Sequence, residues 1–126
     1  MKGKKIMVCD DDKGISEMLE MLLSDEGYDV SAEIRSVQLL KRIENERPDL
    51  VLLDIWMPVV SGDQILRSMR ASPSICNIPV LMYSASTEGK KIAEAAGADN
   101  YIAKPFDLDK LLALIENMLQ KKTSAQ

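Results

Sequence analysis

The chain has 126 residues, a length typical of one globular domain, and its 46% hydrophobic and 29% charged residues are an ordinary composition for such a domain. Its formal net charge of −4 argues against a general binder of nucleic acid or anionic membranes. No apolar run approaches the ~20 residues that a membrane helix needs. Histidine is absent, which excludes histidine-based catalysis and histidine metal ligands. Cys9 and Cys76 form no metal or disulfide spacing, and no secretory pattern opens the chain, so we expect reduced thiols and a cytoplasmic location.

Short apolar runs alternate with amphipathic segments along the chain, a pattern typical of strands alternating with helices. In chain order, the sequence predicts a strand at 5–9, a helix at 13–26, a strand at 28–32, a helix at 36–46, a strand at 50–54, a helix at 63–71, a strand at 80–84, a helix at 87–96, a strand at 101–103 and a helix at 107–120. Residues 122–126 are polar and predicted to be a tail, so we expect the domain to span 1–121.

Several boundaries carry local signals. Asp12 is placed to cap the first helix, Gly27 stands where a helix C-terminal glycine belongs, and Pro48 follows the second helix. Strands that alternate with helices at this spacing imply a parallel sheet covered on both faces. Right-handed crossovers then leave few topologies for a chain of five strands and five helices. The sequence therefore predicts a doubly wound α/β fold.

Polar residues gather at the ends of the predicted strands. Asp10 and Asp11 end the first strand, Asp54 the third and Ser84 the fourth, and the fifth runs into Lys104. In open parallel sheets, ligands bind at the carboxyl ends of the strands, where the strand order reverses. If the order is 2-1-3-4-5, the ends of the first and third strands are neighbours there. Three carboxylates, one hydroxyl and one ammonium group would then share a small basin.

This combination of groups suggests phosphoryl chemistry with a metal ion. Three crowded carboxylates repel one another unless a cation neutralises them, and an oxygen-only set of ligands favours a hard cation such as Mg²⁺. A carboxylate can act as the nucleophile that forms an acyl phosphate, while a lysine and a hydroxyl hold the phosphoryl oxygens. Asp54 is the candidate nucleophile because it faces the lysine and hydroxyl strands most directly, with Asp10 and Asp11 on the metal side.

Five ordered blocks resemble the receiver domains of bacterial two-component response regulators, over about residues 5–119. The blocks are Val8–Asp12, Pro48–Asp54, Met57–Pro58 followed by Gly62, Pro79–Ala85, and Gly97–Asp99 leading to Ala103–Phe106. Each block alone is weak, whereas all five in order and at this spacing are specific. The resemblance implies the flavodoxin-like fold of chemotaxis receivers, a five-stranded parallel sheet in the order 2-1-3-4-5 with five helices.

The resemblance also implies an acceptor and a metal site. Asp54 would accept a phosphoryl group in trans from a histidine kinase or a histidine phosphotransfer protein. Asp11 would bind Mg²⁺ directly and Asp10 through water. The phosphoacceptor Asp54 and the backbone carbonyl of Trp56 would complete the protein ligands.

The remaining implied roles concern the phosphoryl group and its readout. Lys104 would pair with the phosphoryl group, beside a cis Lys104–Pro105 bond, and Ser84 would hydrogen-bond a phosphoryl oxygen. Tyr101 would turn inward when Ser84 moves toward the phosphate, which would change the face formed by 87–96, 101–103 and 107–120. The implied function is a phosphorylation-dependent signalling switch, with only autocatalytic phosphotransfer and autodephosphorylation as chemistry.

Further expectations concern tuning and partners. Trp56, Ala85 and Ser86 flank the acceptor and would modulate the phosphoryl site. Many winged-helix DNA-binding regulators carry an arginine in a charged dimer face where this chain has Leu114, so we expect a monomer or weak dimer. We also expect no direct nucleic-acid binding and no membrane insertion. The sequence names no kinase, signal or effector, and it fits either a stand-alone receiver or part of a larger regulator.

Plainer interpretations remain open. Asp10–Asp12 could be a solvated acidic turn with a helix cap, Lys104–Pro105 an ordinary loop, and Tyr101 a half-buried strand residue. An aspartyl phosphatase of the haloacid-dehalogenase type needs a second acid two residues after its nucleophile, where this chain has Trp56. A degenerate receiver that serves only as a scaffold would not need the acids, the hydroxyl and Lys104 together.

Overall fold

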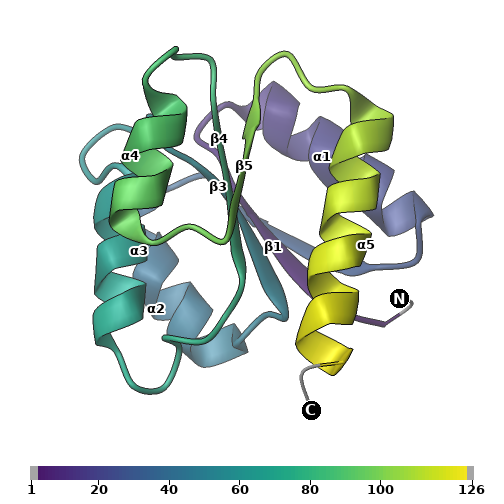
Figure 1. Ribbon diagram of the computed structural model, residues 1–126, viewed down its shortest axis with the longest axis horizontal. Coiled ribbons are helices and arrows are strands. Elements are labelled where there is room, and N and C mark those ends of the chain that lie inside the picture. The colour runs from purple at the N-terminus through teal and green to yellow at the C-terminus, as the bar shows by residue number, and fades with distance from the viewer. Residues whose placement is uncertain (1–2, 125–126) are drawn as a thin grey trace.

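The computed structural model describes the backbone of residues 3–124 and the side chains of residues 3–120 (Figure 1). The strands are β1 (Lys5–Cys9), β2 (Asp29–Glu33), β3 (Leu50–Asp54), β4 (Val80–Ser84) and β5 (Asn100–Ala103). The helices are α1 (Lys13–Asp25), α2 (Ser36–Glu46), α3 (Gly62–Ala71), α4 (Gly89–Ala96) and α5 (Leu108–Ser124). Strands and helices alternate strictly, as the hydrophobic pattern predicted.

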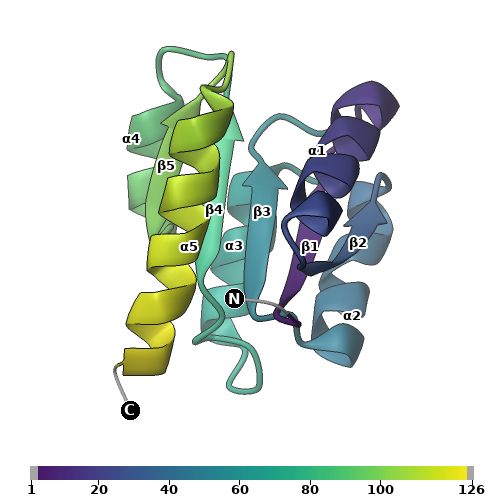
Figure 2. The same ribbon diagram turned by 90° about the vertical axis from the view of Figure 1, so that its right-hand side faces the viewer.

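The strands form one parallel sheet in the order β2-β1-β3-β4-β5, which confirms the predicted fold. Helices α1 and α5 cover one face, and α2, α3 and α4 cover the other (Figures 1 and 2). Because every strand runs the same way, all carboxyl ends meet at one edge of the sheet. The order reverses between β1 and β3, so these two strands flank the crevice at that edge.

The two central strands β3 and β4 are buried along their whole length, which fixes the positions of their last residues. Alternate residues of each strand enter opposite cores. In β1, Met7 faces the core beneath α2, α3 and α4, whereas Ile6 faces the core beneath α1 and α5. Burying a side chain of this size stabilises the fold by about 1.5–3 kcal/mol. A strand packed on both faces in this way is a rigid support for a site at its end.

Most predicted boundaries hold to within one or two residues. The Asp12 carboxylate accepts the backbone N–H of Ile15 at 3.2 Å, as expected of the cap of α1. Helix α4 begins at Gly89 and not at Thr87, because the Gly89 N–H donates to the Ser86 carbonyl and closes a turn first. No helix within residues 3–124 is both long and apolar enough to cross a membrane.

The last helix is longer than predicted. α5 continues to Ser124, whereas the sequence pattern placed its end at Gln120. The predicted polar tail, 122–126, therefore begins inside a helix, and residues 125–126 lie outside the described part of the chain. The division into a domain at 1–121 and a tail stays a prediction.

Candidate functional site at the carboxyl edge of the sheet

The polar residues predicted to share a basin do come together. Asp10 directly follows β1, Asp54 is the last residue of β3, Ser84 is the last residue of β4, and Lys104 directly follows β5. The sheet order places β3 between β1 and β4, so Asp54 lies between the acids of β1 and the hydroxyl of β4. Residues from four segments of the chain thus meet at one edge.

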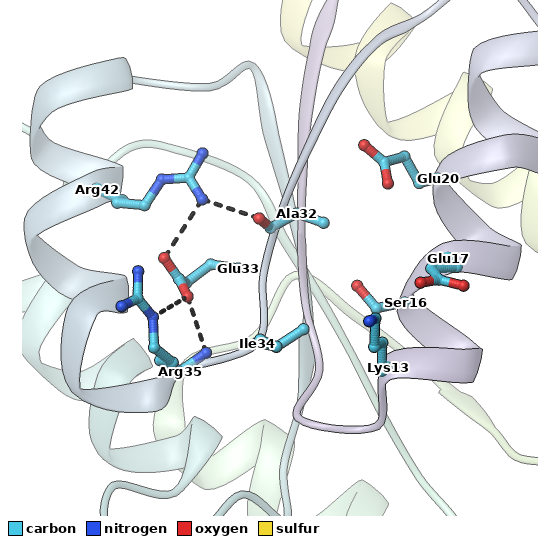
Figure 3. A pocket seen from close by; sticks show the side chains of 9 residues that line it. All are labelled: Lys13, Ser16, Glu17, Glu20, Ala32, Glu33, Ile34, Arg35 and Arg42. Carbon is cyan, nitrogen blue, oxygen red and sulfur yellow. Dashed lines mark hydrogen bonds and ion pairs between the residues drawn. The ribbon is translucent and has the colours of Figure 1, made fainter.

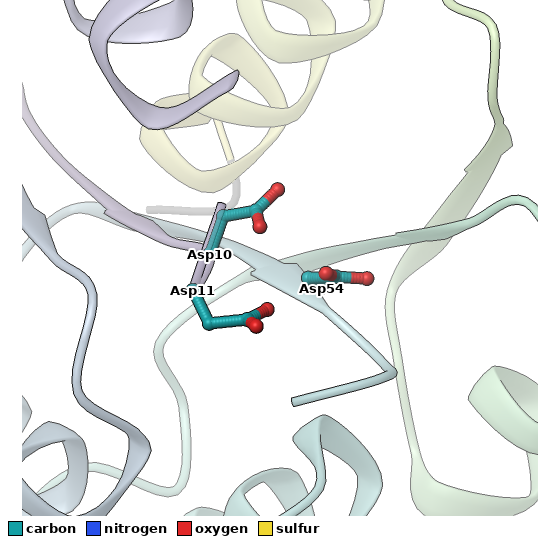
Figure 4. Close-up of side chains that lie close together, drawn as sticks. All are labelled: Asp10, Asp11 and Asp54. Atoms are coloured by element: carbon teal, nitrogen blue, oxygen red, sulfur yellow. The ribbon is translucent and has the colours of Figure 1, made fainter. Parts of the chain in front are cut away.

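Asp10, Asp11 and Asp54 form an acid cluster whose carboxylates converge (Figure 4). One oxygen of each residue lies within 4.8 Å of the others. Asp10 is fully buried, Asp54 is 5% exposed, and Asp11 is open to solvent. Burial and the charge of Asp10 raise the pKa of Asp54 to about 7, against the opposing effects of Lys104 and of the Trp56 backbone N–H. An oxygen-only cluster with this crowding of negative charge fits a hard divalent cation.

Lys104 brings an ammonium group to the acid cluster. Its Nζ atom lies 3.6 Å from Asp10 Oδ2 and 3.9 Å from Asp54 Oδ2. The Lys104 N–H donates to the Ser84 carbonyl at 2.9 Å, which ties the β5 end to β4. The Lys104–Pro105 bond is cis, as expected. The ammonium group therefore stands at hydrogen-bonding range of any anion held beside Asp54.

Tyr83 also belongs to this site, although it was not among the predicted site residues. Its hydroxyl donates to Asp10 Oδ2 at 2.7 Å, and the Lys104 ammonium lies 5.0 Å from the centre of its ring. The backbone N–H of Asp12 donates to the other oxygen, Asp10 Oδ1, at 2.9 Å. A tyrosine fits a buried strand on packing grounds alone. The available signal was its place one residue before Ser84, which sets it beside Asp54 in the β3–β4 register.

Ser84 and Tyr101 are linked through the backbone. The Ser84 hydroxyl oxygen accepts the N–H of Ser86 at 2.9 Å, and Tyr101 Oη donates to the Ser84 carbonyl at 3.2 Å. A Cβ atom at Gly89 would clash with both the Tyr101 hydroxyl and Ser84 Cβ, so glycine allows α4 to pack closely here. Ala85, which is exposed, adds little bulk above the site. These contacts place Tyr101 where a movement of Ser84 would reach it.

The turn after β3 is shaped around Asp54. The Trp56 N–H donates to Asp54 Oδ1 at 3.3 Å, while the Trp56 indole is 54% exposed. Gly62 packs against the Asp54 backbone carbonyl, where a Cβ atom would clash, and its N–H donates to the Ile55 carbonyl at 2.7 Å. A larger residue at position 62 would push the turn away from Asp54.

The two loops that border Asp54 are held differently. Ser36 at the start of α2 donates its hydroxyl to the Pro58 carbonyl at 2.5 Å and accepts the Val60 N–H at 3.4 Å, so the loop after β3 is tied to a neighbouring helix. Among the described residues, the hydrogen bonds of loop 85–88 stay within 84–92. The loop after β3 is therefore anchored to α2 by hydrogen bonds, whereas loop 85–88, among the described residues, has hydrogen bonds only within its own segment.

An apolar cleft of about 560 Å³ opens beside Lys104, between α1 and the connection from β5 to α5. It is lined by Ile15, Met18, Ala85, Lys104, Pro105, Phe106 and Leu108. Met18 and Leu108 are 39% and 40% exposed, so apolar side chains are presented to solvent at the rim of a charged site. This combination is typical of a surface that receives a partner.

A second cleft, of about 390 Å³, lies between α1 and the β2–α2 connection and carries charges of both signs (Figure 3). At its base Glu33 is 4% exposed and accepts the backbone N–H and the guanidinium of Arg35 at 2.9 Å and 3.2 Å. Arg42 Nη1 lies 3.4 Å from Glu33 and also donates to the Ala32 carbonyl at 2.8 Å. Burial acts to raise the pKa of Glu33, but these hydrogen bonds outweigh it and hold the pKa below its usual value. The network fastens α2 to β2.

The sequence of this chain is similar to known response regulators. It is 38% identical over 117 residues to the response regulator MprA of Mycobacterium sp. (strain KMS), across 93% of this chain and 51% of that protein. It is 35% identical over 120 residues to the DNA-binding response regulator MtrA of Mycobacterium leprae (strain TN), across 94% of this chain and 52% of that protein. The chain thus spans about half the length of these relatives.

Solved structures agree with the sequence comparison. A CheY-like response regulator receiver domain protein from Methanospirillum hungatei JF-1 superposes with a TM-score of 0.90 at 30% identity, covering 99% of this chain and 100% of the other. A response regulator from Chloroflexus aurantiacus J-10-fl gives 0.89 at 30% identity, covering 94% and 99%. The sequence model of the response regulator receiver domain matches residues 6–116. With the predicted sheet order and the acids, hydroxyl and lysine gathered at its edge, this match shows that the chain belongs to the receiver domain family of two-component response regulators.

Proposed function

We propose that the chain is a phosphorylation-dependent signalling switch that accepts a phosphoryl group on Asp54. The observation that carries this proposal is the position of the Asp54 carboxylate. It lies within 4.8 Å of two further carboxylates and 3.9 Å from the Lys104 ammonium. Phosphoryl transfer depends mainly on positioning and on neutralising charge, and this arrangement supplies both.

In the proposed transfer, one Asp54 oxygen attacks the phosphorus of a phosphohistidine. The O–P bond forms as the P–N bond of the donor breaks, and the leaving imidazole takes a proton from solvent. These 126 residues contain no histidine, so the phosphohistidine would lie outside this domain, on a histidine kinase or a histidine phosphotransfer protein. Lys104 would pair with the transferred group, and the Ser84 hydroxyl, now 1% exposed at the end of β4, would donate to one of its oxygens.

We further propose that the acid cluster holds Mg²⁺. Asp10, Asp11 and Asp54 would supply carboxylate oxygens, and the Trp56 carbonyl a backbone oxygen. The donor set supports this choice because it contains neither nitrogen nor sulfur. When bound, the ion would offset the negative charge that the carboxylates share with the phosphoryl group.

The readout we propose starts at Ser84. The Ser84 hydroxyl oxygen accepts the Ser86 N–H and can still donate its own proton to a phosphoryl oxygen. If the side chain moves toward that oxygen, we expect the loop that begins at Ser86 to move with it, and the bond between Tyr101 and the Ser84 carbonyl to shift. Tyr101 also lines a shallow cleft between β5 and α5 that includes Leu114. The face of α4, β5 and α5 would thus present a different surface to an effector. Ala85, Ser86 and Trp56 would tune how long the phosphoryl group lasts.

The proposed partners follow from the surface of the domain. The apolar cleft beside Lys104 would receive the protein that carries the phosphohistidine. The name of MtrA describes that relative as DNA-binding, but it is about twice as long as this chain. Given the net charge of −4, we expect this domain itself to bind no nucleic acid, and to be a cytoplasmic monomer or weak dimer with no metabolic reaction of its own.

Intact-mass spectrometry after incubation with Mg²⁺ and acetyl phosphate tests the proposal. Asp54 would attack phosphorus and release acetate, so the wild type should gain the mass of one phosphoryl group. Asp54→Asn should gain none, whereas Asp25→Asn, which changes an exposed aspartate at the end of α1, should behave like the wild type. EDTA during the reaction should abolish the adduct. If no adduct forms with short incubation or with phosphoramidate, the scaffold function is favoured.

A further inference from the structure

Tyr83 makes a contact that the phosphotransfer chemistry does not require. Its hydroxyl donates to Asp10 Oδ2 at 2.7 Å, and the exposed fraction of both residues is 0%. The same oxygen faces the Lys104 ammonium at 3.6 Å. The other oxygen, Oδ1, accepts the Asp12 N–H at 2.9 Å. Both oxygens of Asp10 are therefore engaged by donors from the protein itself.

A hydrogen bond to a carboxylate is strongest when that carboxylate carries its full negative charge. A cation beside the carboxylate draws off part of this charge, so the same donor is then bound less strongly. The Tyr83 hydroxyl consequently stabilises the metal-free cluster more than the metal-bound cluster. An interaction that stabilises the metal-free state more than the metal-bound state lowers the affinity for the metal.

We propose that Tyr83 is a positioning residue that competes with a divalent cation for Asp10 and thereby lowers the affinity of the acid cluster for Mg²⁺. This inference rests on the proposed function, because it assumes that the cluster is a Mg²⁺ site. It adds a way of setting the Mg²⁺ concentration at which the acceptor becomes competent.

Tyr83 could instead serve only as core packing. Its ring contacts the Phe106 ring edge-on, with 5.0 Å between centroids, and belongs to the core beneath α1 and α5. Tyr83→Phe separates the two roles, because it keeps the ring and removes only the hydroxyl. Tyr28→Phe is the matched control. Tyr28 is a buried tyrosine of the same core, and it precedes β2 at the end of the sheet opposite the acid cluster.

The experiment is a Mg²⁺ titration of wild type, Tyr83→Phe and Tyr28→Phe, followed by the fluorescence of Trp56, the single tryptophan, and by calorimetry. We expect the dissociation constant of Tyr83→Phe to fall about three- to ten-fold, and that of Tyr28→Phe to stay at the wild-type value. Without Mg²⁺, Tyr83→Phe should melt at a lower temperature than the wild type, and saturating Mg²⁺ should narrow this gap.

An unchanged or higher dissociation constant for Tyr83→Phe would overturn the inference and leave the proposed function intact. A wild type that binds no Mg²⁺ would overturn both. If Tyr83→Phe does not fold, the wild type labelled with ¹³C at tyrosine Cζ provides the test. The Tyr83 resonance should move on saturation with Mg²⁺ as the donated bond weakens, while the Tyr28 resonance should not. If the Tyr83 resonance does not shift on saturation with Mg²⁺, the proposal that Tyr83 competes with the cation for Asp10 is contradicted.

Discussion

Lys104 Nζ lies 3.9 Å from Asp54 Oδ2, although Asp54 ends β3 and Lys104 follows β5, two strands that are not neighbours in the sheet. β4 lies between them, and the lysine side chain reaches back over its end. At this distance the ammonium group is in electrostatic contact with the carboxylate but is not locked to it by a short hydrogen bond. It is therefore free to follow a phosphoryl oxygen when one is placed on Asp54.

Replacing Lys104 with methionine should have opposite effects on transfer and on metal affinity. Without the ammonium group, phosphorylation by acetyl phosphate should slow by about ten-fold or more, because a phosphoryl partner is lost. Mg²⁺ should bind about ten-fold more tightly, because a cation beside two carboxylates is removed. Mass spectrometry over time and a fluorescence titration measure the two effects. Lys41→Met, which changes an exposed lysine of α2, is the control. Weaker Mg²⁺ binding in Lys104→Met would contradict the assigned role.

The raised pKa of Asp54, about 7, predicts how the stability of the metal-free protein depends on pH. The folded chain keeps this proton at pH values where the unfolded chain has lost it. The contribution of Asp54 is complete below about pH 4 and is lost as the pH rises through about 7. Near pH 8, Asp54→Asn should therefore have a larger free energy of unfolding than the wild type, by on the order of a few kcal/mol, and should melt at a higher temperature. The gap should narrow as the pH falls and close near pH 4, where the unfolded chain also takes up the proton. A gap that grew as the pH fell would refute the assignment.

Trp56 should affect the lifetime of the phosphorylated state. Trp56 is 54% exposed and follows Asp54 by two residues, and we infer from this position that its indole shields a phosphorylated Asp54 from water. We expect Trp56→Asn to hydrolyse several-fold faster than the wild type, by the order of magnitude of a lost positioning contact. Decay of the phosphoryl adduct after removal of the donor gives the rate. Trp56→Phe, which keeps an aromatic cover, should stay close to the wild type, and an unchanged lifetime in Trp56→Asn would end this interpretation.

The Glu33 network should be important for stability rather than for transfer. Arg42→Met leaves a nearly buried carboxylate short of a partner, which should cost about 1–3 kcal/mol near neutral pH in urea unfolding. Because the pKa of Glu33 is lowered by folding, its contribution is present above the ordinary pKa of a glutamate and is lost as the pH falls through the lowered value. The cost of Arg42→Met should shrink in that acidic range.

Arg67→Met provides the comparison for Arg42→Met. Arg67 forms an exposed pair with Asp63 on α3 at 2.8 Å, and its side chain is 54% exposed. Such a pair contributes about 0.5 kcal/mol or less. Equal losses from the two arginine variants would show that the burial of Glu33 has no special effect.

Residue types and strand order were sufficient to predict where Asp10, Asp54, Ser84 and Lys104 meet. Each ends or follows a recognisable strand, and parallel strands bring their carboxyl ends to one edge. The start of α4 was missed by two residues because the turn at Ser86–Gly89 uses side-chain and backbone bonds that a periodicity does not report.

The role of Tyr83 could not be predicted in the same way. Its hydroxyl meets Asp10 across 73 positions of sequence, and the contact depends on which core its ring enters. A hydrophobic pattern assigns such a ring to the interior but says nothing about its polar end. Local sequence signals therefore located the charged residues at the strand ends. The hydrogen bond from the Tyr83 hydroxyl to Asp10 depends on tertiary packing and became visible only in the structure.

The two loops beside Asp54 are anchored unequally, and this difference sets the side toward which a structural change at Asp54 would be transmitted. Ser36 of α2 forms hydrogen bonds with the loop after β3. Among the described residues, the hydrogen bonds of loop 85–88 stay within residues 84–92. A phosphoryl group added at Asp54, as proposed, would meet a loop anchored to α2 on one side and a loop without such an anchor on the other. We therefore expect the mechanical effect of phosphorylation to be directed toward α4 and Tyr101, with the α2–α3 flank as its support.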